Sequence, residues 1–131
     1  MSTTPVAPET LNLPPQVRRS VDLLFDRKAT DVTLLELKGI SSATDYFLIA
    51  TGRSDTHVSA IADNLIDELR NEGIRPTNVE GLRGGRWVLI DYFDFVVHVF
   101  HPAAREFYQL ERLWGDAPQH VLGSGEPTSA S

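Results

Sequence analysis

The sequence predicts an α+β fold, in which helices pack on one mixed five-stranded sheet within a single domain. Three observations support this fold class. The 131 residues suffice for one hydrophobic core but not for two. Segments with helical apolar spacing are interspersed with short aliphatic and β-branched runs. The resulting order of elements, α-β-β-α-β-β-β-α, is that of a sheet with helices packed on it.

The first half of the chain contains two predicted helices and two predicted strands. Apolar residues recur at helical spacing over residues 14–29, where two prolines suit a helix start. Residues 31–38 and 45–51 are aliphatic and β-branched runs of the kind found in strands. A long helix over residues 54–72 follows, with one apolar stripe and with Ser54 as its N-cap.

The second half of the chain contains three predicted strands and a last helix. Residues 77–80 form a short strand, and the glycine-rich sequence GLRGGR separates it from a strand over 86–92. A turn leads to the strand over 95–101, which ends before Pro102. Residues 103–114 then show the apolar spacing of a helix.

Both ends of the chain are predicted to be flexible tails, residues 1–13 and 119–131, on either side of a domain over 14–118. The tails lack apolar periodicity. No basic segment followed by an apolar run marks a secretory signal, and no run approaches the roughly 20 residues of a membrane-spanning helix. We therefore expect a cytoplasmic protein with no membrane partner, free as a monomer or a homodimer.

The charge of the chain is concentrated in its central part. The formal net charge is −6. Residues 31–116 contain 14 acidic and 8 basic side chains, so the whole surplus lies there and the remaining residues are neutral in sum. Such a surface repels bare nucleic acid and attracts a basic protein. The chain has no cysteine, which excludes a disulfide framework and a thiol nucleophile.

The stretch WVLIDYFDFVVHVFH, from Trp87 to His101, is either a catalytic or metal-binding cluster or a surface that meets another macromolecule. The sequence has no acid-x-acid triplet and no H-x-H or H-x-x-x-H pair, and His98 and His101 point to opposite faces of a strand. Ser54 with His57 has the spacing of a helix cap rather than of a catalytic pair. We therefore predict no catalytic residues, no metal site and no cofactor.

A protein-binding surface is the favoured interpretation of this stretch. Strand alternation places Trp87, Leu89 and Asp91 on one face. Trp87 is either a core aromatic or a half-exposed anchor, and exposed aromatics beside acids are typical of binding hot spots. The residues predicted to form the surface are, at its centre, Trp87, Asp91, Tyr92 and Asp94, and nearby, Asp45, Glu80 and His98. Arg105, Glu106 and Tyr108 of the last helix are expected at its rim.

Three stretches of the chain resemble the ribosomal silencing factor family, which is also called Iojap-like. They are TDYFLIATGRSDTHVSAIAD, VEGLRGGRWVLIDYFDFVVHVFH and REFYQLERLWGDAP. The resemblance runs from about Val17 to Pro118 and leaves only the tails outside. One departure is Phe93, where many members carry glycine between the two aspartates, and this departure concerns the tightness of the turn.

The resemblance implies a fold related to nucleotidyltransferases but without their catalytic acids. It also implies a protein that binds the large ribosomal subunit through ribosomal protein uL-fourteen, at the face that meets the small subunit. Such binding blocks subunit joining and lowers translation when nutrients are short, and the family is also linked to large-subunit assembly. Two alternatives are a nucleotidyltransferase-like enzyme that acts on a nucleotide and a dimeric regulatory module that does not bind ribosomes.

Overall fold

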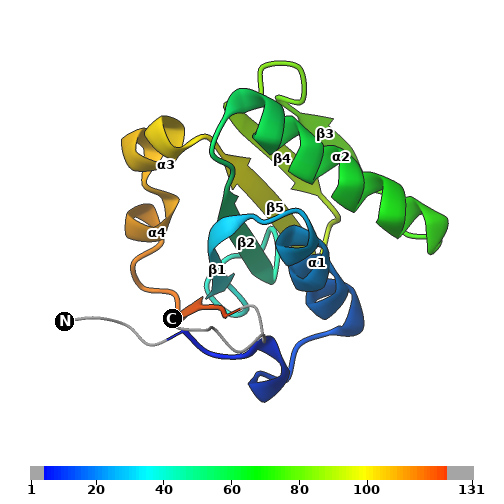
Figure 1. Ribbon diagram of the computed structural model, residues 1–131. Coiled ribbons are helices and arrows are strands. Elements are labelled where there is room, and N and C mark those ends of the chain that lie inside the picture. The colour runs from blue at the N-terminus through cyan, green and yellow to red at the C-terminus, as the bar shows by residue number, and fades with distance from the viewer. Residues whose placement is uncertain (1–4, 124–131) are drawn as a thin grey trace.

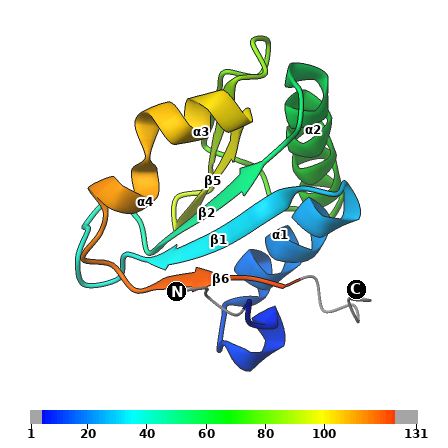
Figure 2. The ribbon, with the colours of Figure 1, turned by 60° about the vertical axis from the view of Figure 1, so that its left-hand side comes forward.

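The computed structural model describes residues 5–123, which form one six-stranded mixed sheet with helices on both of its faces (Figures 1 and 2). The strand order across the sheet is β3-β4-β5-β2-β1-β6. The elements along the chain are η1 (Pro8–Thr10), α1 (Pro15–Asp26), β1 (Thr30–Glu36), β2 (Tyr46–Thr51), α2 (Asp55–Asn71), β3 (Asn78–Glu80), β4 (Trp87–Asp91), β5 (Phe95–Phe100), α3 (Pro102–Tyr108), α4 (Leu110–Leu113) and β6 (Gln119–Val121).

The sheet is mixed because one pair of neighbouring strands is parallel. β2 and β5 run in the same direction, with Tyr46 opposite Phe95 and Thr51 opposite Phe100. The other neighbours, β3 with β4, β4 with β5, β2 with β1 and β1 with β6, are antiparallel. The predicted α+β class and mixed sheet are thus confirmed.

One face of the sheet is covered by α1 and α2 (Figure 1). The apolar stripe of α2 buries Val58, Ile61, Leu65 and Leu69 completely against the strands, as its helical spacing predicts. The predicted N-cap is also present, because the Ser54 side chain accepts a hydrogen bond from the His57 backbone N–H at 3.1 Å. This face holds the larger of the two hydrophobic clusters.

The opposite face carries α3 and α4, which lie on the other side of the sheet from α1 and α2 (Figure 2). Its smaller cluster joins strand residues such as Leu35, Ile49 and Phe100 to Ala104 of α3 and Leu110 of α4. The predicted single helix over residues 103–114 is divided in two, because Gln109 adopts a left-handed backbone conformation with φ of 47°.

The sixth strand lies in a region that the sequence assigns to a tail. Gln119–Val121 pairs with β1, with Thr33 opposite Val121 and Leu35 opposite Gln119. Leu122 is 5% exposed and belongs to the larger core cluster, and Val6 forms a bridge with it. The start of the predicted tail at residue 119 is therefore wrong, since three residues are too few to show strand alternation. Residues 1–4 and 124–131 lie outside the described part of the chain.

No helix between residues 5 and 123 is both long enough and apolar enough to cross a bilayer.

The substitution Leu122→Ala tests whether the C-terminal strand belongs to the folded domain. We expect the free energy of unfolding to fall by about 2–3 kcal/mol, because a buried leucine is truncated. Urea unfolding measures this loss, and Ser42→Ala, in an exposed turn, serves as the control. Equal stability of the Leu122 variant and the unaltered protein would contradict the docking of this strand.

Candidate functional site

The sheet face that carries α3 and α4, called the second sheet face below, has an open part that is formed by β4. Its residues alternate between half-buried and buried, so that Trp87, Leu89 and Asp91 point away from α1 and α2, as strand alternation predicts. Glu80 of β3 and His98 of β5 lie opposite Leu89 in the two neighbouring strands. Four of the predicted surface residues, namely Trp87, Asp91, Glu80 and His98, are therefore brought together on one face.

Trp87 is neither a fully buried core residue nor a free surface residue. Its side chain is partly buried and packs against the smaller core cluster. Its ring lies over Phe100 with a centroid separation of 5.0 Å, and Tyr108 lies 4.6 Å away. The indole Nε1–H donates a hydrogen bond to Nδ1 of His98 at 3.0 Å. These contacts hold the ring in one orientation while part of it remains accessible.

His98 is a buried neutral imidazole that holds the Trp87 ring through a hydrogen bond. It is 3% exposed, and burial lowers its pKa to about 4 because the charged form is poorly solvated there. An indole N–H can only donate, so Nδ1 of His98 accepts and Nε2 carries the proton. Among the described residues, Nε2 has no hydrogen-bond partner.

An aromatic and apolar rim surrounds Trp87 and His98. Phe47 packs edge-on against His98, with ring centroids 4.5 Å apart, and against Trp114 at 5.9 Å. Beyond these partly buried rings, α3 and α4 expose Phe107 (79%), Tyr108 (49%) and Leu113 (73%). Phe107 packs edge-on against Tyr108, with ring centroids 5.0 Å apart, and exposed apolar side chains that adjoin one another are typical of docking surfaces.

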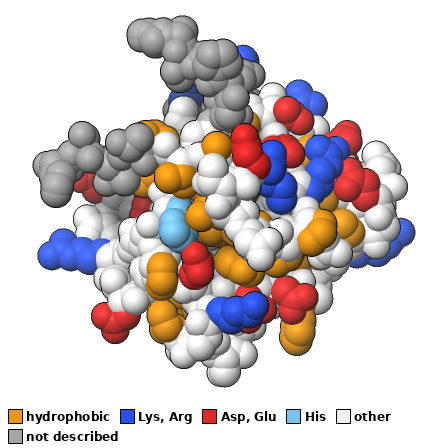
Figure 3. Space-filling model, turned by 90° about the horizontal axis from the view of Figure 1, so that it is seen from below, with side chains coloured by type: hydrophobic (Ala, Val, Ile, Leu, Met, Phe, Trp, Pro, Cys, Tyr) orange, Lys and Arg blue, Asp and Glu red, His pale blue; other side chains and the backbone are white. Residues whose placement is uncertain are grey.

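The acidic residues of the candidate site are not neutralised by ion pairs within residues 5–123. Asp45, Glu80, Asp91 and Asp94 take part in none of the described salt bridges. Charges of both signs are dispersed among hydrophobic side chains on the face drawn in Figure 3.

Two of these aspartates lie at the end of the sheet rather than on its open face. The Asp45 backbone N–H donates to the carbonyl oxygen of Asp94 at 3.0 Å, which joins the loop before β2 to the β4–β5 turn. Both residues line a pocket with Lys38 beside the start of α1. The predicted surface is thus divided between the open face and this end.

Tyr92 lies in the core rather than on the predicted surface. Its side chain is 7% exposed and stacks on Phe95 at 5.0 Å. It follows the alternation of Val88 and Ile90 and so points toward the α1–α2 side. Burial raises the pKa of its hydroxyl to about 12, and this hydroxyl has no hydrogen-bond partner among the described residues.

The turn between β4 and β5 has an unusual residue at its tip. Phe93 has a φ of 75° and is 69% exposed. Its backbone N–H donates to Oδ1 of Asp91 at 2.8 Å, which fixes the turn. A side chain in the left-handed region costs about 1 kcal/mol or more. The departure from glycine noted in the sequence therefore leaves a tight turn that is locally strained.

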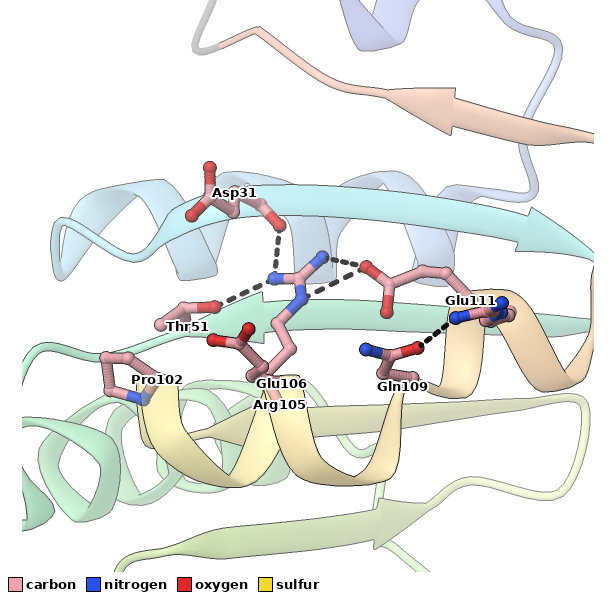
Figure 4. Close-up of a pocket in the computed structure, with 8 residues that line it drawn as sticks. Asp31, Thr51, Pro102, Arg105, Glu106, Gln109 and Glu111 are labelled. Atoms are coloured by element: carbon pink, nitrogen blue, oxygen red, sulfur yellow. Dashed lines mark hydrogen bonds and ion pairs between the residues drawn. The ribbon is translucent and has the colours of Figure 1, made fainter.

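A separate pocket of about 390 Å³ lies between α3, α4 and the strands, and Arg105 crosses it (Figure 4). The guanidinium donates to the Asp31 carbonyl oxygen at 2.6 Å, to Thr51 Oγ1 at 2.8 Å, and to Thr33 Oγ1 at 3.1 Å. Its Nε and Nη2 atoms donate to Oε2 of Glu111 at 3.0 and 2.5 Å.

The network of Arg105 uses all five N–H groups that a guanidinium carries. Its side chain is 13% exposed, so it is not a rim residue as the sequence suggested. The pocket therefore offers no unused arginine donor from this residue to a phosphate. Between residues 5 and 123, no group of three or more His, Cys, Asp or Glu side chains could hold a metal ion.

The chain is similar to known proteins along most of its length. A family model described as "Ribosomal silencing factor during starvation" matches residues 10–131. "Ribosomal silencing factor RsfS" of Bacillus subtilis (strain 168) is 50% identical over 100 residues, which cover 76% of this chain and 85% of that protein. "Mitochondrial assembly of ribosomal large subunit protein 1" of Mus musculus is 31% identical over 97 residues, which cover 72% of this chain and 42% of that protein.

A solved structure supports the fold. The crystal structure of a protein from Chromobacterium violaceum has a TM-score of 0.76 and 32% identity to this chain, and the match covers 91% of this chain and 100% of that one.

Acid should destabilise the domain through His98. Its pKa is about 4 when folded and about 6.5 when unfolded, so only the unfolded chain binds this proton between pH 6.5 and 4. The stability contribution is therefore complete above pH 6.5 and is lost as the pH falls to 4, by about 3 kcal/mol in total.

Urea unfolding at pH 7 and at pH 4.5 measures this dependence, with His98→Phe as the matched variant. The variant should lose less stability between the two pH values, by about 2–3 kcal/mol. An identical loss in both proteins would show that His98 is not buried in its neutral form.

A third prediction concerns the hydrogen-bond network of Arg105. Arg105→Lys keeps the charge but cannot make the same forked contacts, so we expect the free energy of unfolding to fall by about 2–3 kcal/mol. Arg112→Lys, at an exposed position with one hydrogen bond to Gln109, should leave stability nearly unchanged. Thermal melting compares both variants with the unaltered chain. A melting temperature of Arg105→Lys equal to that of the unaltered chain would refute the role of the network.

Proposed function

We propose that this chain, which belongs to the ribosomal silencing factor family, binds the large ribosomal subunit through ribosomal protein uL-fourteen. Bound there, it blocks association with the small subunit and represses translation during nutrient limitation. It acts as a regulatory protein rather than as an enzyme, and it works in the cytoplasm, where ribosomes are. The proposal also includes a part in large-subunit assembly, because a mouse relative carries that activity in its name.

The observation that carries this proposal is the open half of the second sheet face. It presents a fixed, partly exposed Trp87, with the exposed Tyr108 of α3 packed beside it. Asp91 lies on the same face and Glu80 in the neighbouring strand, and neither forms an ion pair among the described residues. An aromatic anchor with an acidic surround fits a basic protein surface better than a nucleic acid.

In this proposal the predicted surface residues have different roles. Trp87, Asp91 and Glu80 would contact the partner directly, with Asp94 and Asp45 at the adjoining end of the sheet. His98 would not contact the partner but would hold the Trp87 ring in place through its hydrogen bond. Tyr92 would support the hairpin from the core.

Repression in this proposal is steric. A bound domain of this size on the subunit-joining face leaves no room for the small subunit, and no chemical step is needed. The occupied large subunit is released for joining when the domain dissociates.

The first test of this proposal is whether large subunits retain the purified chain. The chain is mixed with purified bacterial large ribosomal subunits and pelleted, and small subunits are then added. We expect co-pelleting and fewer joined ribosomes. Retention of a labelled nucleotide with its turnover, and no retention by large subunits, would instead favour the nucleotidyltransferase-like alternative. Retention of neither would favour a regulatory module that does not bind ribosomes.

Neutralising the acids should slow association with the large subunit. We expect the double variant Asp91→Asn with Asp94→Asn to associate about three- to tenfold more slowly at low salt, with a weaker salt dependence. The matched control is Asp63→Asn with Asp67→Asn, which removes the same charge from the exposed side of α2. Association rates measured at several salt concentrations would exclude this surface if both doubles behaved alike.

A further inference from the structure

The β4–β5 turn presents a large aromatic side chain that the fold does not use. Phe93 is 69% exposed and belongs to neither hydrophobic cluster. By contrast, the neighbouring Tyr92 and Phe95 are buried and stack on each other. Packing within the described residues therefore does not explain an aromatic residue at this position.

The backbone of the turn favours glycine at the same position. Tyr92 and Phe95 close the hairpin, since the Tyr92 N–H donates to the Phe95 carbonyl oxygen at 2.9 Å. Phe93 and Asp94 are the two residues between them, and only Phe93 has a positive φ. The Asp94 N–H also donates to the Tyr92 carbonyl oxygen at 2.9 Å, which makes Phe93 the central residue of a three-residue γ-turn with positive φ, a rare and strained conformation. Phenylalanine is thus unfavourable there for the backbone and contributes little to the core.

The surroundings of Phe93 are acidic. Asp91 accepts the hydrogen bond from the Phe93 backbone N–H, Asp94 follows directly and is exposed, and Asp45 is joined to Asp94 through the backbone. None of these three carboxylates takes part in a described salt bridge. An exposed ring among unpaired carboxylates is complementary to a basic surface that has an apolar depression.

We propose that Phe93 is an anchor that inserts into an apolar depression on the basic protein partner, while Asp91 and Asp94 pair with basic side chains around it. The inference rests on the proposed function and extends its binding surface from the open sheet face to the β4–β5 turn. The turn leaves the Phe93 ring exposed to solvent, where a partner can reach it.

Substitution with glycine separates binding from folding at this position. Phe93→Gly relieves the backbone, so its melting temperature should equal or exceed that of the unaltered chain. Its dissociation constant for purified bacterial large subunits should rise about tenfold or more, mainly through faster dissociation. Phe93→Trp keeps an aromatic anchor and should retain most of the affinity.

Lys28→Gly is the matched control. Lys28 also has a positive φ, of 62°, but lies exposed just beyond α1. Its replacement should leave large-subunit binding unchanged while relieving the backbone in the same way.

The outcomes distinguish this inference from the proposed function. If the unaltered chain does not bind large subunits, the proposed function fails. If it binds and Phe93→Gly binds equally well, only the anchor is refuted. Sedimentation velocity of the free proteins tests whether Phe93 instead contacts a second copy of this chain. If Phe93→Gly changes self-association and leaves large-subunit binding unchanged, Phe93 belongs to a contact between copies and the proposal is refuted.

Discussion

The hydrogen-bond network of Arg105 is the interaction on which the layout of the second sheet face depends. One guanidinium ties α3 to β1, β2 and α4 through backbone, hydroxyl and carboxylate oxygens. The α3–α4 segment is thereby fixed over the smaller core cluster, although Gln109 interrupts its helix. Trp87, Leu89 and Asp91 of β4 stay half exposed beside it. The network positions the candidate site through contacts within the domain.

The β4–β5 hairpin contains three local features that do not favour folding. Nε2 of His98 and the hydroxyl of Tyr92 are buried without a partner among the described residues, and Phe93 has a left-handed backbone. Each costs free energy of folding. Departures of this kind are expected where a surface serves function rather than stability. Their concentration in the hairpin that carries Trp87 and both aspartates agrees with an interaction site there.

Most of the fold follows from sequence patterns, whereas much of the site does not. The α2 stripe and the Ser54 cap depend on local spacing, and β4 alternation places Trp87 with Asp91. The three-residue β6 strand carries no such signal, because its pairing with β1 is a long-range contact. The sequence predicts a surface position for Arg105, because its hydrogen-bond partners lie in three elements, two of which are distant in the chain. It predicts a turn position for Tyr92, although this side chain is buried on the same side of the sheet as Val88 and Ile90.

In the proposed function, the open sheet face and the adjoining turn contact the large subunit. Hydroxyl-radical footprinting of side chains, with and without purified large subunits, tests this contact most directly because aromatic residues are readily oxidised. We expect protection of Trp87, Phe93 and Phe107 on binding, with unchanged oxidation of Phe25 on the α1–α2 side. Protection of Phe25 while the other three remain reactive would place the contact on the opposite face and contradict the account.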